Sequence, residues 1–306
     1  MENQEKRRIA YLGPEGTYTW EAARRSLERC QLGELVPFTT PVDVFDAVEK
    51  GDADIGVVAL YNMIRGHVSD IITQIDANHM KMIGQVIVPV DHCIAALPGT
   101  DPDSVTQILS HEQAMRQCSE YLGKRYAEAG KKEVSSTAEG MRRVSEDSLE
   151  GVAALGPEPA ADLYGLQVMD RSISNTSGNA TLFAVIGPER YLGPSSGKDS
   201  TMVALHPGLN RRKGDEKGML LNILQQIYNH DINLTMVESR PDGQWGFIFY
   251  LEMDGHRDDL NVRQALHGID YYLSTRGCTD PEPGTYDPVP GIVRVLGSYS
   301  KVDRTI

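Results

Sequence analysis

Short apolar runs alternate with amphipathic segments over the first ninety residues. The apolar runs lie at residues 8–12, 34–38 and 54–60, and each has the length of a buried strand. Between them, residues 20–30 and 42–51 space their apolar side chains three and four positions apart, as a helix packed on one face does. This order predicts a mainly parallel sheet flanked by helices.

The residues before these helices carry turn and cap signals. The stretch Gly13-Pro14-Glu15-Gly16 interrupts the first run, and Thr17 or Thr19 is expected to cap the helix that follows. A glycine-rich turn between a strand and a helix presents backbone amides, so we expect this turn either to contact an anionic ligand or to serve only as a turn.

A second region of the same kind follows. Residues 82–99 are mostly apolar and long enough to cross to another lobe, and the alternation then continues to the apolar run at 179–188. Two α/β lobes joined by crossing strands leave a cleft between them, which is a common place for a small ligand.

The composition changes at residues 187–198, which are rich in Gly, Pro and Ser and predict a linker. Beyond the linker, helix-like segments at 217–232 and 261–273 alternate with strand-like ones in the order strand, helix, strand, strand, helix, strand. That order is the split motif of ferredoxin-like domains. The Pro/Gly-rich stretch 279–291 predicts a loop before the last strand.

The charge balance narrows the classes of partner. With 30 basic and 43 acidic residues the chain has a net charge of −13, which argues against binding nucleic acid or an anionic membrane surface. The charged N-terminus has no apolar stretch of signal-peptide length, and no apolar run reaches the roughly eighteen residues of a membrane span, so we expect a cytoplasmic protein.

The cysteines and histidines give no sign of a metal site. Cys30, Cys93, Cys118 and Cys278 are far apart in the sequence, and without a secretion signal we expect reduced thiols rather than two disulfides. No pair of histidines has the spacing of a metal motif, so we expect no metal and no other cofactor.

Six motifs follow one another along the chain. They are YLGPEGTYTWEAA from Tyr11, DIGVVALYNMIRGHV from Asp54, ILSHEQAMRQC from Ile108, SSTAEG from Ser135, NATLFAVIG from Asn179 and INLTMVESRP from Ile232. In this order they resemble the motifs of the prephenate dehydratase superfamily.

The resemblance implies an α/β fold with a bilobal catalytic region like that of periplasmic binding proteins, followed by a ferredoxin-like regulatory domain of the ACT type. The implied bounds are 1–190 for the catalytic region (lobe 1 at 7–88 and 179–190, lobe 2 at 89–178), 191–198 for the linker and 199–306 for the ACT domain. Because the edges of ferredoxin-like sheets pair readily, we expect a homodimer or homotetramer.

Two motifs depart from the family pattern. Where the family usually has Glu-Asn-Ser, this chain has Tyr61-Asn62-Met63, and where it has Thr-Arg-Phe, this chain has Thr181-Leu182-Phe183. The family's reaction expels carbon dioxide and hydroxide from prephenate and needs a proton donor at the hydroxyl, a role ascribed to this Thr, with the Arg as an anion partner. A leucine forms no hydrogen bond, and the loss of one charge-assisted bond costs about 1.5–3 kcal/mol.

The departures lead to the hypothesis of a prephenate decarboxylase. Such an enzyme releases carbon dioxide, retains the hydroxyl and makes a dihydro-4-hydroxyphenylpyruvate for a secondary metabolite such as an antibiotic. The alternatives are a prephenate dehydratase that makes phenylpyruvate for phenylalanine biosynthesis, and a non-catalytic homologue that only senses a ligand.

The resemblance also selects candidate site residues. The catalytic candidates are Thr181, Asn62 and Tyr61, and the substrate-binding candidates are Thr17, Met63, His111, Gln113, Gln117, Ser136, Thr137, Asn179, Leu182 and Phe183.

A site for an aromatic amino-acid effector is the expectation for the ACT domain. The motif Glu238-Ser239-Arg240-Pro241 matches the family, whereas Gly218-Met219-Leu220 stands where Gly-Ala-Leu is usual. Methionine adds volume there, which argues against tight phenylalanine binding, so the domain either binds the effector or serves as a dimer contact with weak or absent effector binding.

Overall fold

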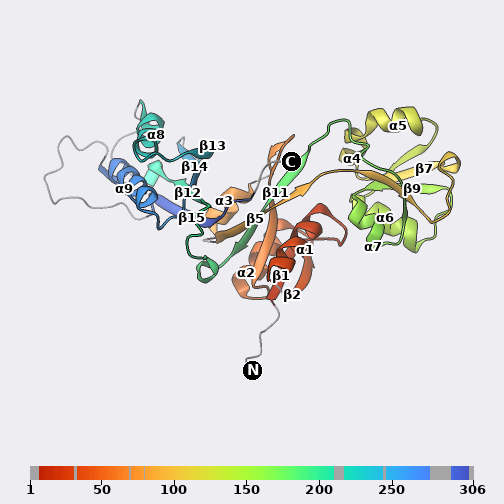
Figure 1. Cartoon of the computed structure of the whole chain (residues 1–306), viewed down its shortest axis with the longest axis horizontal. Coiled ribbons are helices and arrows are strands. Elements are labelled where there is room, and N and C mark those ends of the chain that lie inside the picture. The colour runs from red at the N-terminus through yellow and green to blue at the C-terminus, as the bar shows by residue number, and fades with distance from the viewer. Residues whose placement is uncertain are drawn as a thin grey trace, which may run out of the picture. The chain divides into compact units, whose positions relative to one another are not determined.

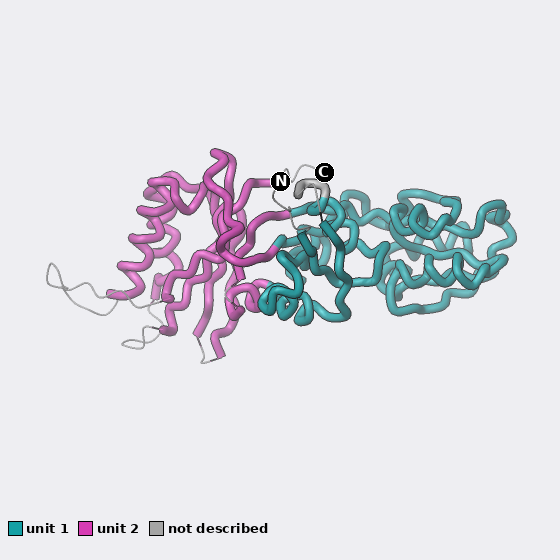
Figure 2. Tube along the Cα trace, turned by 90° about the horizontal axis from the view of Figure 1, so that it is seen from below, with its two compact units in different colours: residues 1–71, 86–185, 304–306 teal, residues 72–85, 186–303 magenta. Residues whose placement is uncertain are grey.

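The chain forms two compact units, of which unit 1 contains two lobes, each with its own sheet, and unit 2 contains an antiparallel sheet. The computed structural model describes residues 7–30, 33–68, 70–78, 80–209, 217–243, 246–275 and 291–302. Unit 1 comprises residues 1–71, 86–185 and 304–306, and unit 2 comprises 72–85 and 186–303 (Figure 2). The boundaries fall inside β5 (Lys81–Pro89) and β11 (Ala180–Gly187), so each of these strands contributes residues to both units.

The first lobe of unit 1 is the predicted parallel sheet with helices (Figure 1). Its strands run in the order β2-β1-β3-β11, and β1 pairs in parallel with both of its neighbours. The elements are β1 (Arg7–Leu12), α1 (Tyr18–Cys30), β2 (Gly33–Phe38), α2 (Pro41–Lys50), β3 (Ile55–Asn62) and the short β4 (Gly66–His67), which pairs antiparallel with β3.

Side-chain caps start both helices of this lobe. Thr17, rather than Thr19, precedes α1, and its hydroxyl accepts a hydrogen bond from the Trp20 amide at 3.2 Å. Thr40 and Asp43 form a reciprocal capping box at the start of α2, in which each side chain accepts from the other residue's amide. The predicted helix starts are therefore confirmed within a few residues.

The second lobe is a mixed sheet in the order β10-β6-β9-β7-β8. Strands β7, β8 and β9 pair in parallel, whereas β6 pairs antiparallel with β9 and β10. The elements are β6 (Cys93–Ala96), β7 (Gln107–Ser110), α4 (Glu112–Gln117), α5 (Ser119–Arg125), β8 (Gly130–Glu133), α6 (Thr137–Glu146), β9 (Val152–Gly156), α7 (Glu158–Leu163) and β10 (Gln167–Asp170).

Helices cover both faces of this second sheet, because its strand residues are apolar on both sides. Ile108 packs with Leu122 of α5, and the next residue, Leu109, packs on the other face with Met141 of α6. Successive side chains of a strand point to opposite faces, so one short run serves two cores. A run that is apolar at every position is typical of such a sheet.

Unit 2 has the predicted order βαββαβ. Its strands run in the antiparallel order β13-β14-β12-β15, which is the ferredoxin-like topology. The elements are β12 (Asp199–Leu205), α8 (Met219–Asn229), β13 (Leu234–Pro241), β14 (Phe247–Asp254), α9 (Leu260–Thr275) and β15 (Val293–Ser300). Most of α3 (Ile71–Ala77) and the first part of β5 also belong to this unit, a feature that the sequence patterns did not predict.

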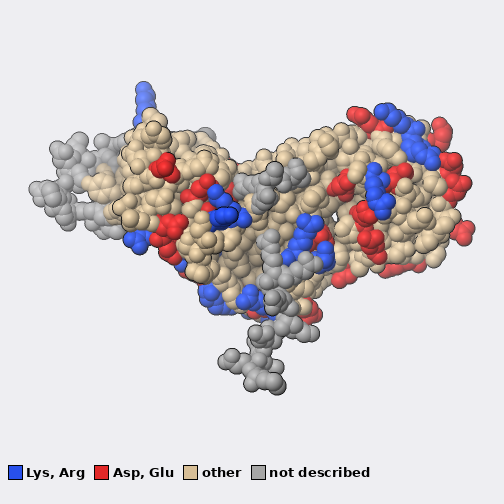
Figure 3. Space-filling model, in the orientation of Figure 1, with Lys and Arg blue, Asp and Glu red and all other residues tan. Residues whose placement is uncertain are grey.

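The remaining sequence expectations concern charge, membranes and cysteines. On the face shown in Figure 3, acidic and basic side chains are interspersed over the lobe that carries α4–α7. In the ranges that the structure describes, no helix combines the length and the apolar character needed to cross a bilayer. Cys93 and Cys118 are buried free thiols, whereas Cys278, the Cys30 side chain and most of the predicted loop at 279–291 lie outside the description.

Candidate active site

A cavity of about 380 Å³ in unit 1 brings together residues of both lobes. It is lined by the β1–α1 turn, the ends of β3 and β11, the crossing after β5, and the segments that begin α4 and α6. Nine predicted site residues line it: Thr17, Asn62, His111, Gln113, Gln117, Ser136, Thr137, Thr181 and Phe183. A cavity of this size fits a small organic ligand.

Asn62 at the end of β3 links this strand to the start of the neighbouring strand β11. Its side-chain amide donates to Asn179 Oδ1 and Thr181 Oγ1, both at 3.0 Å, and to the Ala180 carbonyl at 3.2 Å. Its carbonyl oxygen accepts from the amides of Ile64 and Arg65, both at 3.1 Å. The Asn62 side chain is 8% exposed, and these bonds use both of its ends.

The Thr181 hydroxyl keeps its hydrogen available. Its oxygen accepts from Asn62, the residue is 8% exposed, and no acceptor for its hydrogen is found among the described residues. A hydroxyl carries one donor and two acceptor positions. Thr181 also lines the cavity, so it is placed to donate to a ligand there.

The segments that begin two long helices line the cavity. Thr17 caps α1, and Ser136 caps α6 by accepting from the Glu139 amide at 3.0 Å. The first-turn amides of a helix lack intrahelical partners and carry the positive end of the helix dipole. The cavity therefore receives two helix ends that favour an anion.

A buried histidine links the crossing after β5 to both lobes. His92 is 3% exposed, with Nδ1 3.0 Å from the Tyr18 hydroxyl of α1 and Nε2 3.1 Å from Gln117 Oε1 of α4. The Tyr18 hydroxyl also donates to the Asp91 carbonyl at 2.7 Å. Burial lowers the pKa of His92 in spite of the opposing effects of Gln117 and Asp91, so the ring is neutral near pH 7.

The lining holds one full positive charge and no carboxylate. Arg65 contributes the guanidinium, which has no ion-pair partner in the described part of the chain. Six lining side chains are apolar: Leu12, Ala59, Val68, Val90, Ala114 and Phe183. Across the described ranges, no group of three His, Cys, Asp or Glu side chains is placed to hold a metal ion.

Four predicted residues lie outside the lining. Leu182 is partly buried and sits between Thr181 and Phe183 on β11, so its side chain points to the opposite face of the strand. Tyr61 is 37% exposed and stands edge-on to His67 of β4, with ring centroids 5.2 Å apart. Met63 is 54% exposed, and Asn179 supports Asn62 from behind the cavity wall.

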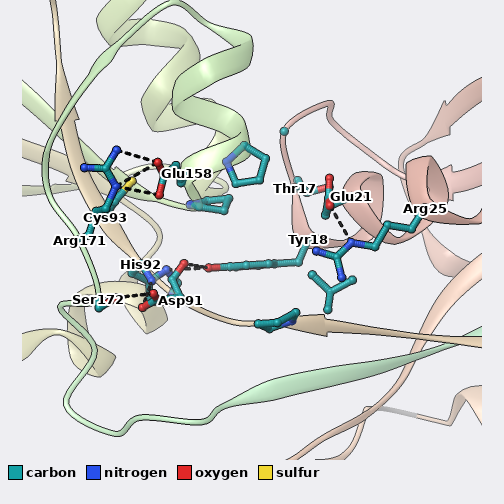
Figure 4. A pocket seen from close by; sticks show the side chains of 15 residues that line it. Thr17, Tyr18, Glu21, Arg25, Asp91, His92, Cys93, Glu158, Arg171 and Ser172 are labelled. Carbon is teal, nitrogen blue, oxygen red and sulfur yellow. Dashed lines mark hydrogen bonds and ion pairs between the residues drawn. The ribbon is translucent and has the colours of Figure 1, made fainter. Parts of the chain in front are cut away.

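A smaller cavity of about 170 Å³ shares Thr17, Tyr18 and His92 with the first. Figure 4 shows the Tyr18 ring reaching from α1 toward His92 and Asp91. Four charged groups around this cavity form two pairs, Glu21 with Arg25 and Glu158 with Arg171, whereas Asp91 is hydrogen-bonded to Ser172 (Figure 4). Tyr18 and His92 therefore form a wall with a cavity on either side.

The two candidate effector segments lie in unit 2. Gly218 precedes α8 with a positive φ of 85°, and the Met219 side chain is buried in the hydrophobic core of the unit. The added volume of this methionine is thus taken up inside the core. Glu238 and Arg240 of the edge strand β13 form an ion pair on one face, while Val237 on the other face is 49% exposed.

The candidate site residues left out part of the lining, including Tyr18, His92 and Arg65. Tyr18 and Arg65 lie inside recognised motifs, but nothing in the periodicity joins Tyr18 to a histidine 74 positions away. A signal was available for His92, because polar residues that directly follow a long apolar strand lie where a crossing strand leaves its lobe.

Comparisons with known proteins agree over most of the chain. Residues 9–191 match the family described as prephenate dehydratase. The bifunctional chorismate mutase/prephenate dehydratase of Aquifex aeolicus is 34% identical over 267 residues, which cover 86% of this chain and 70% of that protein. The protein of the same description from Escherichia coli K12 is 31% identical over 270 residues, covering 86% of this chain and 67% of that protein.

Among solved structures, the prephenate dehydratase of Arthrobacter aurescens in complex with L-Phe is similar in both fold and sequence. It is 26% identical with a TM-score of 0.79, and the match covers 97% of this chain and 91% of that chain. The similarity therefore includes residues of both units.

Proposed function

Because the chain belongs to the prephenate dehydratase family, we propose that it is a lyase that acts on prephenate and removes only the ring carboxylate. One proton is taken up at a ring carbon as carbon dioxide leaves, and the carbon–oxygen bond of the ring hydroxyl stays intact. The product is a dihydro-4-hydroxyphenylpyruvate, which fits a secondary-metabolite pathway such as antibiotic biosynthesis.

The observation that carries this proposal is the lining of the larger cavity, in which no described side chain is a carboxylate. Dehydration requires an acid next to the departing hydroxyl, and a carboxyl group with a raised pKa is a frequent solution. Position 61, where the family usually has a glutamate, holds a tyrosine that packs on His67 outside the lining. A hydroxyl that meets no such acid is retained.

The polar and apolar parts of the lining suit the two carboxylates of prephenate differently. Arg65, the Gln117 amide and the helix end at Ser136 can hold the pyruvyl carboxylate by charge and hydrogen bonds. The apolar residues around Phe183 favour loss of the other carboxylate, because its charge spreads into the ring as neutral carbon dioxide departs.

A prephenate dehydratase is the second candidate, and Thr181 is the observation that favours it. This residue occupies the family's catalytic threonine position, and its hydroxyl hydrogen is available in the cavity. The relatives from Aquifex aeolicus and Escherichia coli carry the dehydratase name. In this reaction Thr181 would protonate the ring hydroxyl, which leaves as water together with carbon dioxide, giving phenylpyruvate.

One incubation separates the candidates. Purified protein is mixed with prephenate, and the ring and carbinol protons are followed by NMR. We expect the carbinol proton to persist in a new non-aromatic product while carbon dioxide is released. Aromatic phenylpyruvate would establish the dehydratase instead, and unchanged prephenate that nevertheless binds would leave a ligand sensor.

We also propose that residues 199–306 act as an ACT-type regulatory domain behind a linker at 191–198, with residues 1–190 as the catalytic region. The ferredoxin-like topology of unit 2 and the L-Phe complex of the Arthrobacter aurescens relative support this division. Phenylalanine is the effector to test by calorimetry, and light scattering tests the expected homodimer or homotetramer. No heat of binding for phenylalanine would leave the domain as a dimer contact.

A further inference from the structure

The side chain of Gln117 has two chemically different ends, and only one of them is engaged. Its Oε1 lies 3.1 Å from His92 Nε2, whereas its amide nitrogen has no partner in the described part of the chain. Because Gln117 lines the larger cavity, the end that does not face His92 is the end offered to a ligand. An NH₂ group there donates to an anion, and a carbonyl there would repel one.

The position of the proton on the His92 imidazole decides which end of the Gln117 side chain faces the cavity. A ring with its proton on Nε2 donates to Gln117 Oε1 and leaves the NH₂ group toward the cavity. In the same tautomer, the single hydrogen of the Tyr18 hydroxyl is accepted by two groups in a three-centre bond: the Asp91 carbonyl at 2.7 Å and Nδ1 of His92 at 3.0 Å. A ring with its proton on Nδ1 would instead require Gln117 to turn over and present its carbonyl.

Burial keeps this arrangement from exchanging freely with solvent. His92 is 3% exposed, and its neighbours hold it from three directions: Tyr18 from α1, Gln117 from α4, and Asp91 next to it in the chain. The Asp91 carboxylate is occupied by the His92 amide and the Ser172 hydroxyl. The thiols of Cys93 and Cys118 near Tyr18 are neutral, because burial raises the pKa of each to about 12.

We propose that His92 is a positioning residue that fixes the amide of Gln117 with its NH₂ group toward the cavity, as a donor to a carboxylate of the ligand. The identity of that ligand as prephenate rests on the proposed function. The orientation of Gln117 rests on the geometry alone.

A double-mutant cycle tests the proposal with prephenate binding as the readout. His92→Gln places an amide nitrogen near the position of Nε2, and His92→Asn places one near Nδ1. We expect His92→Gln to bind prephenate within about threefold of wild type and His92→Asn to bind roughly tenfold or more weakly, the effect of losing one charge-assisted hydrogen bond.

The second arm of the cycle removes the amide that His92 is proposed to hold. In a Gln117→Met background, His92→Asn should add less than about twofold, because the two residues then no longer act on the same bond. A full additional tenfold loss would overturn the proposal. Thermal unfolding of each variant checks folding, and His230→Gln at the end of α8 is the matched histidine control, with unchanged binding.

The tautomer itself is measured by ¹⁵N NMR of the histidine side chains in the free wild-type protein. A proton on Nε2 of His92 supports the proposal, and a proton on Nδ1 with a bare Nε2 overturns it, whatever the substrate is. If wild type fails to bind prephenate, the proposed function fails. If it binds and the cycle shows no coupling, only the role of His92 fails.

Discussion

Two of the buried polar clusters in the described part of the chain differ in the hydrogen-bonding capacity that they leave unused. The neutral cluster at the larger cavity consists of Asn62, Asn179 and Thr181, and it ties the end of β3 to the start of β11. Each of these residues is at most 8% exposed. The amide hydrogens of Asn62 are consumed inside the cluster, but the Thr181 hydrogen is not, so the cluster keeps a donor for a ligand.

The second cluster lies in unit 2 and is charged. The Asp76 carboxylate is 4% exposed, 2.8 Å from His206 Nε2 and 3.2 Å from Arg294 Nη1, and it accepts from the Tyr250 hydroxyl at 3.4 Å. Burial alone would raise the pKa of Asp76, but His206 and Arg294 outweigh it and hold the pKa below the usual range. Both carboxylate oxygens are occupied within the unit.

The difference separates a structural cluster from a functional one. Asp76 lies on α3, and its partners come from β14, from β15 and from the residue after β12, so the cluster joins distant segments of one unit. Around Asn62, the cluster positions one group that has hydrogen-bonding capacity to spare next to a cavity. Both clusters are buried and hydrogen-bonded. Only the cluster at the cavity has a hydrogen-bond donor left over for a ligand, and that unused donor indicates a binding site.

The largest expected effect is on stability, from Asp76→Ala. Removing the carboxylate leaves the Arg294 side chain without its counter-ion, which should lower the free energy of unfolding by about 3 kcal/mol. Urea denaturation measures the change. The control is Asp46→Ala, whose ion pair with Lys50 is exposed and should contribute less than about 1 kcal/mol. Equal losses of unfolding free energy in the two variants would contradict a structural role for the Asp76 cluster.

Thr181→Val should have the opposite profile. It removes the spare donor while Asn62 keeps two other acceptors, so we expect kcat/KM with prephenate to fall roughly ten- to a hundredfold with less than about 1 kcal/mol lost in stability. The matched control is Thr201→Val in β12, a buried threonine that donates to the Gly255 carbonyl at 2.8 Å. That variant should lose stability and keep its activity. The reverse result would contradict the distinction between the clusters.

The neutral state of His92, which lines the same cavity as Asn62 and Thr181, can be tested by varying the pH. Its pKa is lowered in the folded protein, so below about 6.5 the unfolded chain binds a proton that the folded chain does not. The free energy of unfolding should therefore fall as the pH decreases from 7 toward 5, by up to about 1.4 kcal/mol per pH unit from this group. In His92→Gln this part of the slope should vanish, as urea titrations at several pH values would show. An unchanged slope would mean that His92 titrates normally.

The smallest effect is expected for Leu182→Arg. The side chain at position 182 points away from the face that Thr181 and Phe183 present to the cavity, so prephenate binding should change by less than about threefold. NMR of the products and steady-state kinetics give the measurement. Phenylpyruvate made by this variant alone would show that position 182 acts on the reaction in spite of its orientation.

Period and cap signals are local, so they allowed the sheets and most helices to be predicted. The nine cavity residues were predicted from the resemblance to the motifs of the family. It also contained a warning about Leu182 that the motif comparison overlooked: in a strand, neighbours of Thr181 face away from it. The pairing of Tyr18 with His92 had no local signal, since it depends on how α1 meets the crossing after β5. The seven-residue helix α3 is too short for periodicity to identify.

The division of β5 and β11 between the units has a consequence for cutting the protein into pieces. A protease that cleaves within 191–198 would separate Asp76 from Arg294 and His206 in sequence, although all three belong to unit 2. The close approach of Gly297 to Met82, where an added Cβ would lie 2.1 Å from the Met82 carbonyl oxygen, crosses the same cut. The two nicked fragments should therefore elute together in gel filtration. A fragment expressed from residue 199 onward should lack α3 and the first part of β5, which belong to unit 2.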